Sequence, residues 1–139
     1  MSNVFEKRSI TADKCAEMVT KAVAKANEIG FGISITIVDE SGVVKAFQRM
    51  DNAPLVSIDA SRKKAVTAVG FGMPTGDSWY GFIKDDPILM NGAGQLNDFI
   101  LLGGGSPIMV DEKLVGAVGV SGGHYKQDEE CVTAALGAL

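Results

Sequence analysis

The fold is decided by the stretch Gly103-Gly104-Gly105-Ser106-Pro107, which is followed, after an apolar run, by Gly119-Val120-Ser121-Gly122-Gly123-His124. We name these two segments the first and the second glycine corner. Glycine packs no side chain and loses much chain entropy on folding, so this density needs a geometric reason. We expect two corners at which the backbone closely approaches a ligand or another backbone segment.

The sequence around the two corners predicts strands followed by a helix. Apolar patterns indicate strands near 98–102, 106–110 and 114–120, with Asp111-Glu112-Lys113 as the turn between the last two. A helix is expected from about residue 126 to the end of the sequence, and its acidic first residues suit the positive end of a helix dipole.

The first third of the chain predicts a helix and a β-hairpin. Apolar residues recur at steps of three and four over 11–30, with Thr11 as N-cap and Gly30 as the stop. Isoleucines then alternate with small polar residues over 32–39, and a second strand follows over 43–50 after a polar turn.

A second helix is expected after Pro54, with Ser57 as its N-cap and Gly70 or Gly72 as its stop. Its predicted buried face consists of small and apolar residues: Ile58, Ser61, Ala65, Ala68 and Val69. At 100° per residue, Arg62 and Lys64 flank that face. The small side chains predict a close approach between this helix and the surface that it covers.

The segment 73–98 gives the weakest pattern. Thr75 is a candidate cap for a short helix that Pro87 ends, and 91–94 is expected to be a loop.

The predicted order of elements favours an α+β fold. Most of the expected strands are joined by hairpins, and a parallel sheet would need a helix between successive strands. We therefore expect one domain over residues 1–139, built on an antiparallel sheet of about five strands with helices packed on it.

Composition excludes several classes of protein. The 139 residues are 46% hydrophobic and 22% charged, which is typical of a globular domain rather than a disordered or membrane-spanning chain. The net charge of -4 argues against general nucleic-acid binding. Residues 1–8 lack the apolar core of a signal peptide, so a cytoplasmic protein is expected.

Buried free thiols are the favoured interpretation of Cys15 and Cys131, over a disulfide or a metal pair.

The two glycine corners differ in the chemistry that they offer. The first runs into a strand and matches no nucleotide-binding motif. The second leads from a strand into a helix, so the amides of Gly122 and Gly123 and the Ser121 hydroxyl could converge on an anion or a carbonyl group. Gly104 and Gly105 are candidates to line the same pocket. The alternative is that the glycines serve only the backbone angles of tight connections.

Four side chains are candidates for the same pocket. His124 is the only histidine, and no cluster of metal ligands accompanies it. It is interpreted as an axial haem ligand, as a general acid or base, or as a solvated surface residue. Arg49 beside Asp51 forms a local ion pair or orients a carboxylate. Lys64 could reach the same pocket from the second helix.

Several segments together resemble one family. They are the alanine-rich first helix through Ala26 and Gly30, Ile35-Thr36-Ile37-Val38-Asp39-Glu40-Ser41-Gly42, Arg49-Met50-Asp51, Lys64-Ala65-Val66-Thr67-Ala68, and the two glycine corners followed by Gln127-Asp128-Glu129. In this order, over nearly the whole chain, the sequence is similar to the GlcG/HbpS family, also described as DUF336 or haem-degrading-domain-like.

The resemblance implies a profilin-like sandwich with a five-stranded antiparallel sheet and assembly into homo-oligomers. It also implies kinship with the C-terminal domain of propanediol-utilisation corrinoid adenosyltransferases. The implied ligand class is haem or another tetrapyrrole, a corrinoid included. A binding role is favoured over an enzymatic one, because the family implies no established reaction.

Three functions stay open at this point. The first is an accessory protein that binds a tetrapyrrole or a small carboxylate metabolite. Its pocket would be formed by the two glycine corners together with Arg49 and Lys64. The second is an enzyme of diol, glycerol or glycolate metabolism with His124 as acid or base. The third is an assembly partner of a cofactor-dependent enzyme. A small-molecule ligand is expected, and neither a nucleic acid nor a membrane.

Overall fold

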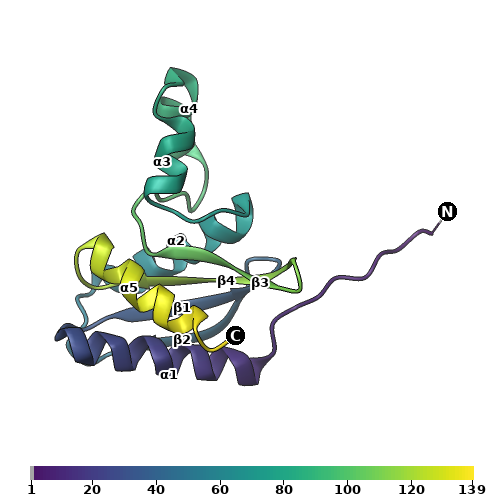
Figure 1. Cartoon of the computed structure of the whole chain (residues 1–139). Helices are drawn as coiled ribbons and strands as arrows, with labels where there is room; N and C mark the ends of the chain where they lie inside the picture. The colour runs from purple at the N-terminus through teal and green to yellow at the C-terminus, as the bar shows by residue number, and fades with distance from the viewer. Residues whose placement is uncertain (1) are drawn as a thin grey trace.

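A computed structural model describes residues 2–139 and shows one antiparallel sheet between two helical layers (Figure 1). Helices α1 (Ala12–Ile29) and α5 (Tyr125–Leu136) cover one face, and α2 (Val56–Phe71) covers the other. Two short helices, α3 (Asp77–Ile83) and α4 (Pro87–Gly92), project from the body as a separate lobe. The predicted α+β class with an antiparallel sheet is confirmed.

Within the described residues the sheet has four strands, so the expected fifth strand is a wrong prediction. The strands are β1 (Ser34–Asp39), β2 (Val44–Arg49), β3 (Gly105–Val110) and β4 (Lys113–Ser121), in the spatial order β2-β1-β4-β3. All neighbouring pairs are antiparallel.

The missing strand was expected near 98–102. Asp98 has a left-handed backbone with φ of 63°, which interrupts an extended run. The amide of Ile100 then donates to Thr67 Oγ1 at 3.0 Å, and the carbonyl of Leu101 accepts from the amide of Gly76 at 2.7 Å. These backbone groups therefore bond to α2 and to the start of the lobe, and not to a neighbouring strand.

The first helix and the hairpin match their predictions closely. Thr11 caps α1 by accepting from the amide of Lys14, and Gly30 ends it with φ of 99°. The apolar stripe of α1 is buried and joins the inner residues of β1, β4 and α5 in the main core. No helix within residues 2–139 is long and apolar enough to cross a lipid bilayer.

Helix α2 differs from its prediction in three places. It begins at Val56, so Ser57 lies inside its first turn, where the hydroxyl sits 2.8 Å from Ser34 Oγ of β1. Ile58 is 38% exposed although it was expected on the buried face, and Lys64 is 1% exposed although it was expected to flank that face. The small buried residues of α2 do pack closely on the sheet, as the Ser61–Thr36 hydroxyl contact of 2.8 Å shows.

The lobe also corrects the sequence prediction. Thr75 does not cap α3; its buried hydroxyl accepts from the amide of Gly105, where β3 begins. Pro87 begins α4 instead of ending a helix, with Asp86 as the N-cap. The expected loop at 91–94 is the end of α4 and a 3-10 turn, Ala93–Gln95. Four aromatic rings pack against one another where α3 meets the end of α2: Phe71, Trp79, Phe82 and Phe99.

Candidate functional site

A buried ion pair holds the second glycine corner in place. Lys64 of α2 reaches under the end of β4, where its Nζ donates to the carbonyl of Val120 at 2.8 Å and to Asp128 Oδ2 at 2.9 Å. The other carboxylate oxygen of Asp128 accepts from the amide of Gly123 at 3.0 Å. Both charged side chains are 2% exposed, so the pair joins α2, β4 and α5 out of contact with water.

Burial and ion pairing shift the pKa values of Lys64 and Asp128 in opposite directions. Burial lowers the pKa of Lys64 and raises the pKa of Asp128, and in each case the partner's charge opposes the shift. The hydrogen bonds to Val120 and Gly123 satisfy further atoms of the pair, which a buried ion pair requires to hold its charges. The sequence predicted Lys64 as a pocket residue, but it assigned Asp128 only to the helix dipole.

The glycines of both corners serve close backbone packing. A Cβ at Gly119 would overlap the Ser61 carbonyl of α2, and a Cβ at Gly105 would overlap the Lys64 carbonyl. Gly104 has φ of 114°, and a Cβ there would lie 2.9 Å from Lys64 Nζ. Gly122 packs in the same way against the backbone of Gly32. The two corners therefore meet on either side of Lys64, and the amide of Gly123 is already bonded to Asp128.

His124 is the exposed N-cap of α5. Its Nδ1 accepts from the amide of Lys126 at 3.1 Å, and its own amide donates to Gln127 Oε1 at 3.1 Å. The neutral imidazole therefore carries its proton on Nε2, which points away from the helix amides. Within residues 2–139 no carboxylate hydrogen-bonds to the ring, so the geometry gives His124 no orienting group for acid or base catalysis.

A cavity of about 340 Å³ lies beside the second corner. Its walls come from the start of α3, the loop before β3 and the start of α5: Gly76, Asp77, Tyr80, Leu101, Leu102, Gly103 and Tyr125. The His124 ring lies 4.3 Å from the Tyr125 ring, and Lys126 binds Asp77 and lies 5.4 Å from the same Tyr125 ring. Apolar walls with a few polar groups at the rim are typical of small-molecule sites. We call this the tyrosine cavity.

None of the predicted site residues lines the tyrosine cavity. Gly103, directly before the predicted Gly104, does line it, and His124 directly precedes the cavity residue Tyr125. Tyr80 was missed because it belongs to the segment 73–98, which gave no clear pattern, and Leu101 and Leu102 were missed because they were assigned to a predicted strand. An aromatic residue directly after the single histidine was the one signal that could have indicated Tyr125.

Arg49 and Asp51 do not reach the tyrosine cavity. Arg49 ends β2 opposite Ser34, which in turn lies opposite Ser121 of β4, so two strand spacings of about 5 Å each separate Arg49 from the second corner. The Arg49 guanidinium donates to the Ala53 carbonyl at 3.3 Å, and it has no ion pair with Asp51 among the described residues. Ser121 is buried at the end of β4.

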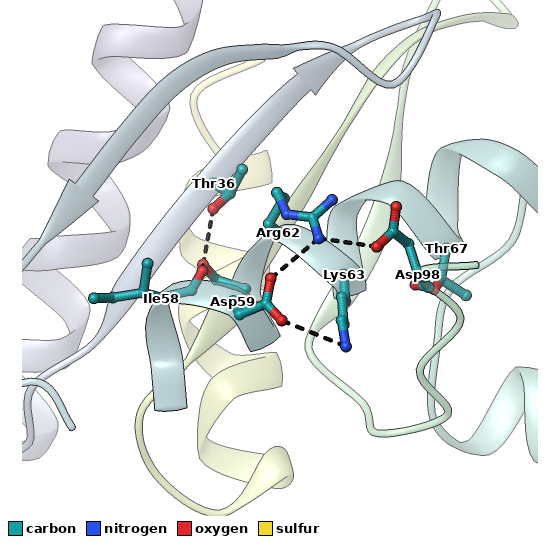
Figure 2. Close-up of polar contacts among 8 residues, drawn as sticks. Thr36, Ile58, Asp59, Arg62, Lys63, Thr67 and Asp98 are labelled. Atoms are coloured by element: carbon teal, nitrogen blue, oxygen red, sulfur yellow. Dashed lines mark hydrogen bonds and ion pairs between the residues drawn. The ribbon is translucent and has the colours of Figure 1, made fainter. Parts of the chain in front are cut away.

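A second charged cluster anchors the loop that forms one cavity wall (Figure 2). Arg62 of α2 bridges Asp59 at 3.0 Å and Asp98 at 2.9 Å, while Lys63 binds the other oxygen of Asp59 at 3.4 Å. The Thr67 hydroxyl donates to the Asp98 carbonyl at 3.0 Å. The Arg62 guanidinium lowers the pKa of Asp98, which favours the charged form that makes this link.

The two thiols lie away from the tyrosine cavity. Cys15 of α1 and Cys131 of α5 are both buried and free. Burial raises the pKa of each, that of Cys131 to about 11, so neither is a reactive thiolate near neutral pH. Within the described residues no group of three or more His, Cys, Asp or Glu side chains could hold a metal ion.

Comparison with known proteins gives consistent matches over the whole fold. A family model described as "Haem degrading protein HbpS-like" matches residues 10–137. An uncharacterized 15.0 kDa protein from the dhaT-dhaS intergenic region of Citrobacter freundii is 34% identical, over 92% of this chain and 90% of its own length. The crystal structure of Klebsiella pneumoniae ORFY has a TM-score of 0.89 at 30% identity, covering 99% of this chain and 95% of that one. The crystal structure of a PduOC–haem complex has a TM-score of 0.86 at 26% identity, covering 94% and 95%.

Proposed function

The chain belongs to the HbpS-like family, and from that premise we propose that it is a small haem-binding accessory protein whose ligand occupies the tyrosine cavity. The observation that carries the proposal is the position of Tyr125 and Leu102 as apolar walls directly beside the only imidazole of the chain. The PduOC neighbour, which shares the fold, was crystallised as a complex with haem.

The residues present fit a tetrapyrrole in two respects. Tyr80, Tyr125 and the two leucines offer flat and apolar surfaces against which a macrocycle can stack. Lys126, now bonded to Asp77, stands at the rim as a cation for a propionate group. When bound, haem supplies an iron that takes one axial ligand from the protein.

His124 fits as that ligand on one condition. A histidine that binds iron through Nε2 carries its proton on Nδ1, and in this structure Nδ1 accepts the Lys126 amide. Ligation by His124 therefore requires the imidazole to release its helix cap, at a cost of about 0.5–2 kcal/mol. Tyr125 and Tyr80, which both line the cavity, are the other side chains that can present a phenol oxygen to the same space.

Titration of the purified protein with haemin tests the proposal. We expect a shifted Soret band with the wild type and a changed spectrum with His124→Asn. Asparagine is among the best N-cap residues, so this variant keeps a cap on α5 and removes the imidazole. Tyr125→Phe keeps the ring and removes the phenol, which separates a tyrosine ligand from a histidine ligand.

Arg49→Gln is the matched control, since Arg49 is a predicted site residue that lies outside the cavity. It should bind haemin as the wild type does. No Soret shift with the wild type, or the same spectrum for the wild type, His124→Asn and Tyr125→Phe, would overturn the assignment. A parallel titration with a cobalamin shows whether a corrinoid competes for the same cavity.

A cytoplasmic location and assembly into homo-oligomers are part of the proposal. The assembly is supported by the resemblance to the family.

A further inference from the structure

The N-terminal arm, residues 2–9, leaves the body of the protein and runs away from it in extended form (Figure 1). It carries two large apolar side chains, Val4 and Phe5, which are 80% and 78% exposed. The arm is anchored at its root, because the Ile10 amide donates to the Val115 carbonyl at 3.0 Å and Lys45 Nζ donates to the Ile10 carbonyl at 2.6 Å. A fixed root with exposed apolar side chains beyond it indicates a segment that is buried against something else.

A groove of about 620 Å³ opens directly at the root of the arm. Residues 8–11 and Lys14 form one wall, and Met109, Val110, Val115 and Leu139 supply apolar surface on the other. Met109 and Leu139 are about half exposed. We name it the root groove, and it is distinct from the tyrosine cavity, with which it shares no residue.

The arm's own chain is a poor occupant of the root groove. Phe5 precedes Arg8, the first residue of the groove wall, by three positions, so its ring could enter only after a chain reversal within those three residues. Residues 2–9 contain no glycine and no proline, the residues that make tight reversals easy.

We propose that the root groove receives the N-terminal arm of a second copy of this chain, so that two copies exchange arms. Arm and groove adjoin each other on every chain, and a two-fold axis at this place lets both arms bind at once and closes the assembly as a dimer. Arg8 pairs with Asp111 of its own chain at 3.3 Å, which holds the start of the arm beside the groove. The exposed apolar side chains Val4 and Phe5 beyond it are therefore the part of the arm that the apolar wall of the partner's groove receives.

Sedimentation measures the contribution of the arm. The wild type should sediment as a dimer or as a multiple of it, and Val4→Ser with Phe5→Ser should raise the dissociation constant of the arm-exchanged pair at least about 100-fold. Ile88→Ser is the matched control, because Ile88 is an equally exposed apolar residue, at 83%, on the lobe. A monomeric wild type, or an equal effect of the control and of the arm variant, would overturn the proposal.

A mixing experiment distinguishes exchange between chains from folding back within one chain. Phe5→Cys and Val110→Cys are made in separate proteins, which are mixed and oxidised under mild conditions. Because Cys15 and Cys131 are buried, the new thiols are the ones that react. Exchange predicts a disulfide-linked dimer that contains one chain of each variant. Absence of this dimer, with intrachain closure in the double variant, would contradict exchange.

Discussion

Replacing Lys64 by methionine is the sharpest test of the buried ion pair. The substitution keeps the length of the side chain and removes its charge, which leaves the Asp128 carboxylate buried with the Gly123 amide as its remaining partner. Breaking a buried pair from one side costs about 3–5 kcal/mol, a large part of the roughly 5–15 kcal/mol by which a domain is stable. We expect the free energy of unfolding to fall by that amount at about pH 7.

The loss in the free energy of unfolding should depend on pH, because the charge of Asp128 depends on pH. Burial raises its pKa in the folded protein, and without Lys64 nothing of comparable strength opposes that rise. A carboxyl group whose pKa is raised on folding contributes stability that is present below its unfolded pKa of about 3.9 and lost as pH rises through the folded pKa. The free energy of unfolding of Lys64→Met should therefore lie closer to that of the wild type at about pH 5 than at about pH 7.

Urea unfolding followed by tryptophan fluorescence measures both effects, since Trp79 is the single tryptophan and is 4% exposed. Lys63→Met is the matched control, because Lys63 forms a surface pair with Asp59 and should change stability by less than about 1 kcal/mol. Lys64→Met combined with Asp128→Asn should recover at least half of the loss, as it removes both charges and keeps the acceptor for Gly123. A loss below about 1 kcal/mol at pH 7, or one that is the same at both pH values, would refute the reasoning.

Three further predictions follow from the packing. Gly119→Ala should destabilise the protein by at least about 2 kcal/mol in thermal unfolding because its Cβ would overlap the α2 backbone, whereas Gly81→Ala, in a helix with free space around it, should be neutral or slightly stabilising. Cys15 and Cys131 should react with a thiol reagent only as fast as the protein opens, and immediate labelling in the absence of urea would show that they are not buried. Arg62→Gln should cost no more than about 1 kcal/mol but speed hydrogen exchange in the segment after α4, and unchanged exchange there would show that the guanidinium does not anchor it.

Much of the fold could be predicted because local patterns agree with tertiary packing. The stripe of α1 and the close backbone approach at the two glycine corners reappear as predicted. The alternation in β1 predicted a strand with one buried face, whereas Ser34 and Thr36 are also buried, because their hydroxyls contact Ser57 and Ser61 of α2. The predicted fifth strand failed at Asp98, where one left-handed residue turned an apolar run into a loop. The sequence of residues 98–102 does not indicate this loop conformation, because the loop is held by contacts with Arg62 and Thr67 of α2, which lies far away in the sequence.

The candidate site was predicted less well, for a related reason. The sequence singled out glycines as ligand contacts, but Gly104 and Gly105 are required by the close approach of α2, and Gly122 by the close approach of the Gly32 backbone. Lys64 was predicted to line a ligand pocket, whereas its Nζ is buried against the Val120 carbonyl and Asp128, a partner 64 residues away in the sequence. The walls of the tyrosine cavity come from three segments that only the folded chain brings together.

The most direct test of the central claim is a proton NMR spectrum of the protein with diamagnetic zinc protoporphyrin IX. The chain has one histidine, so its imidazole signals can be assigned without mutagenesis. If His124 releases its cap and binds the metal above the macrocycle, its ring protons shift strongly upfield and the Tyr125 ring protons shift with them. A bound porphyrin that leaves the signals of both His124 and Tyr125 unchanged would contradict the account.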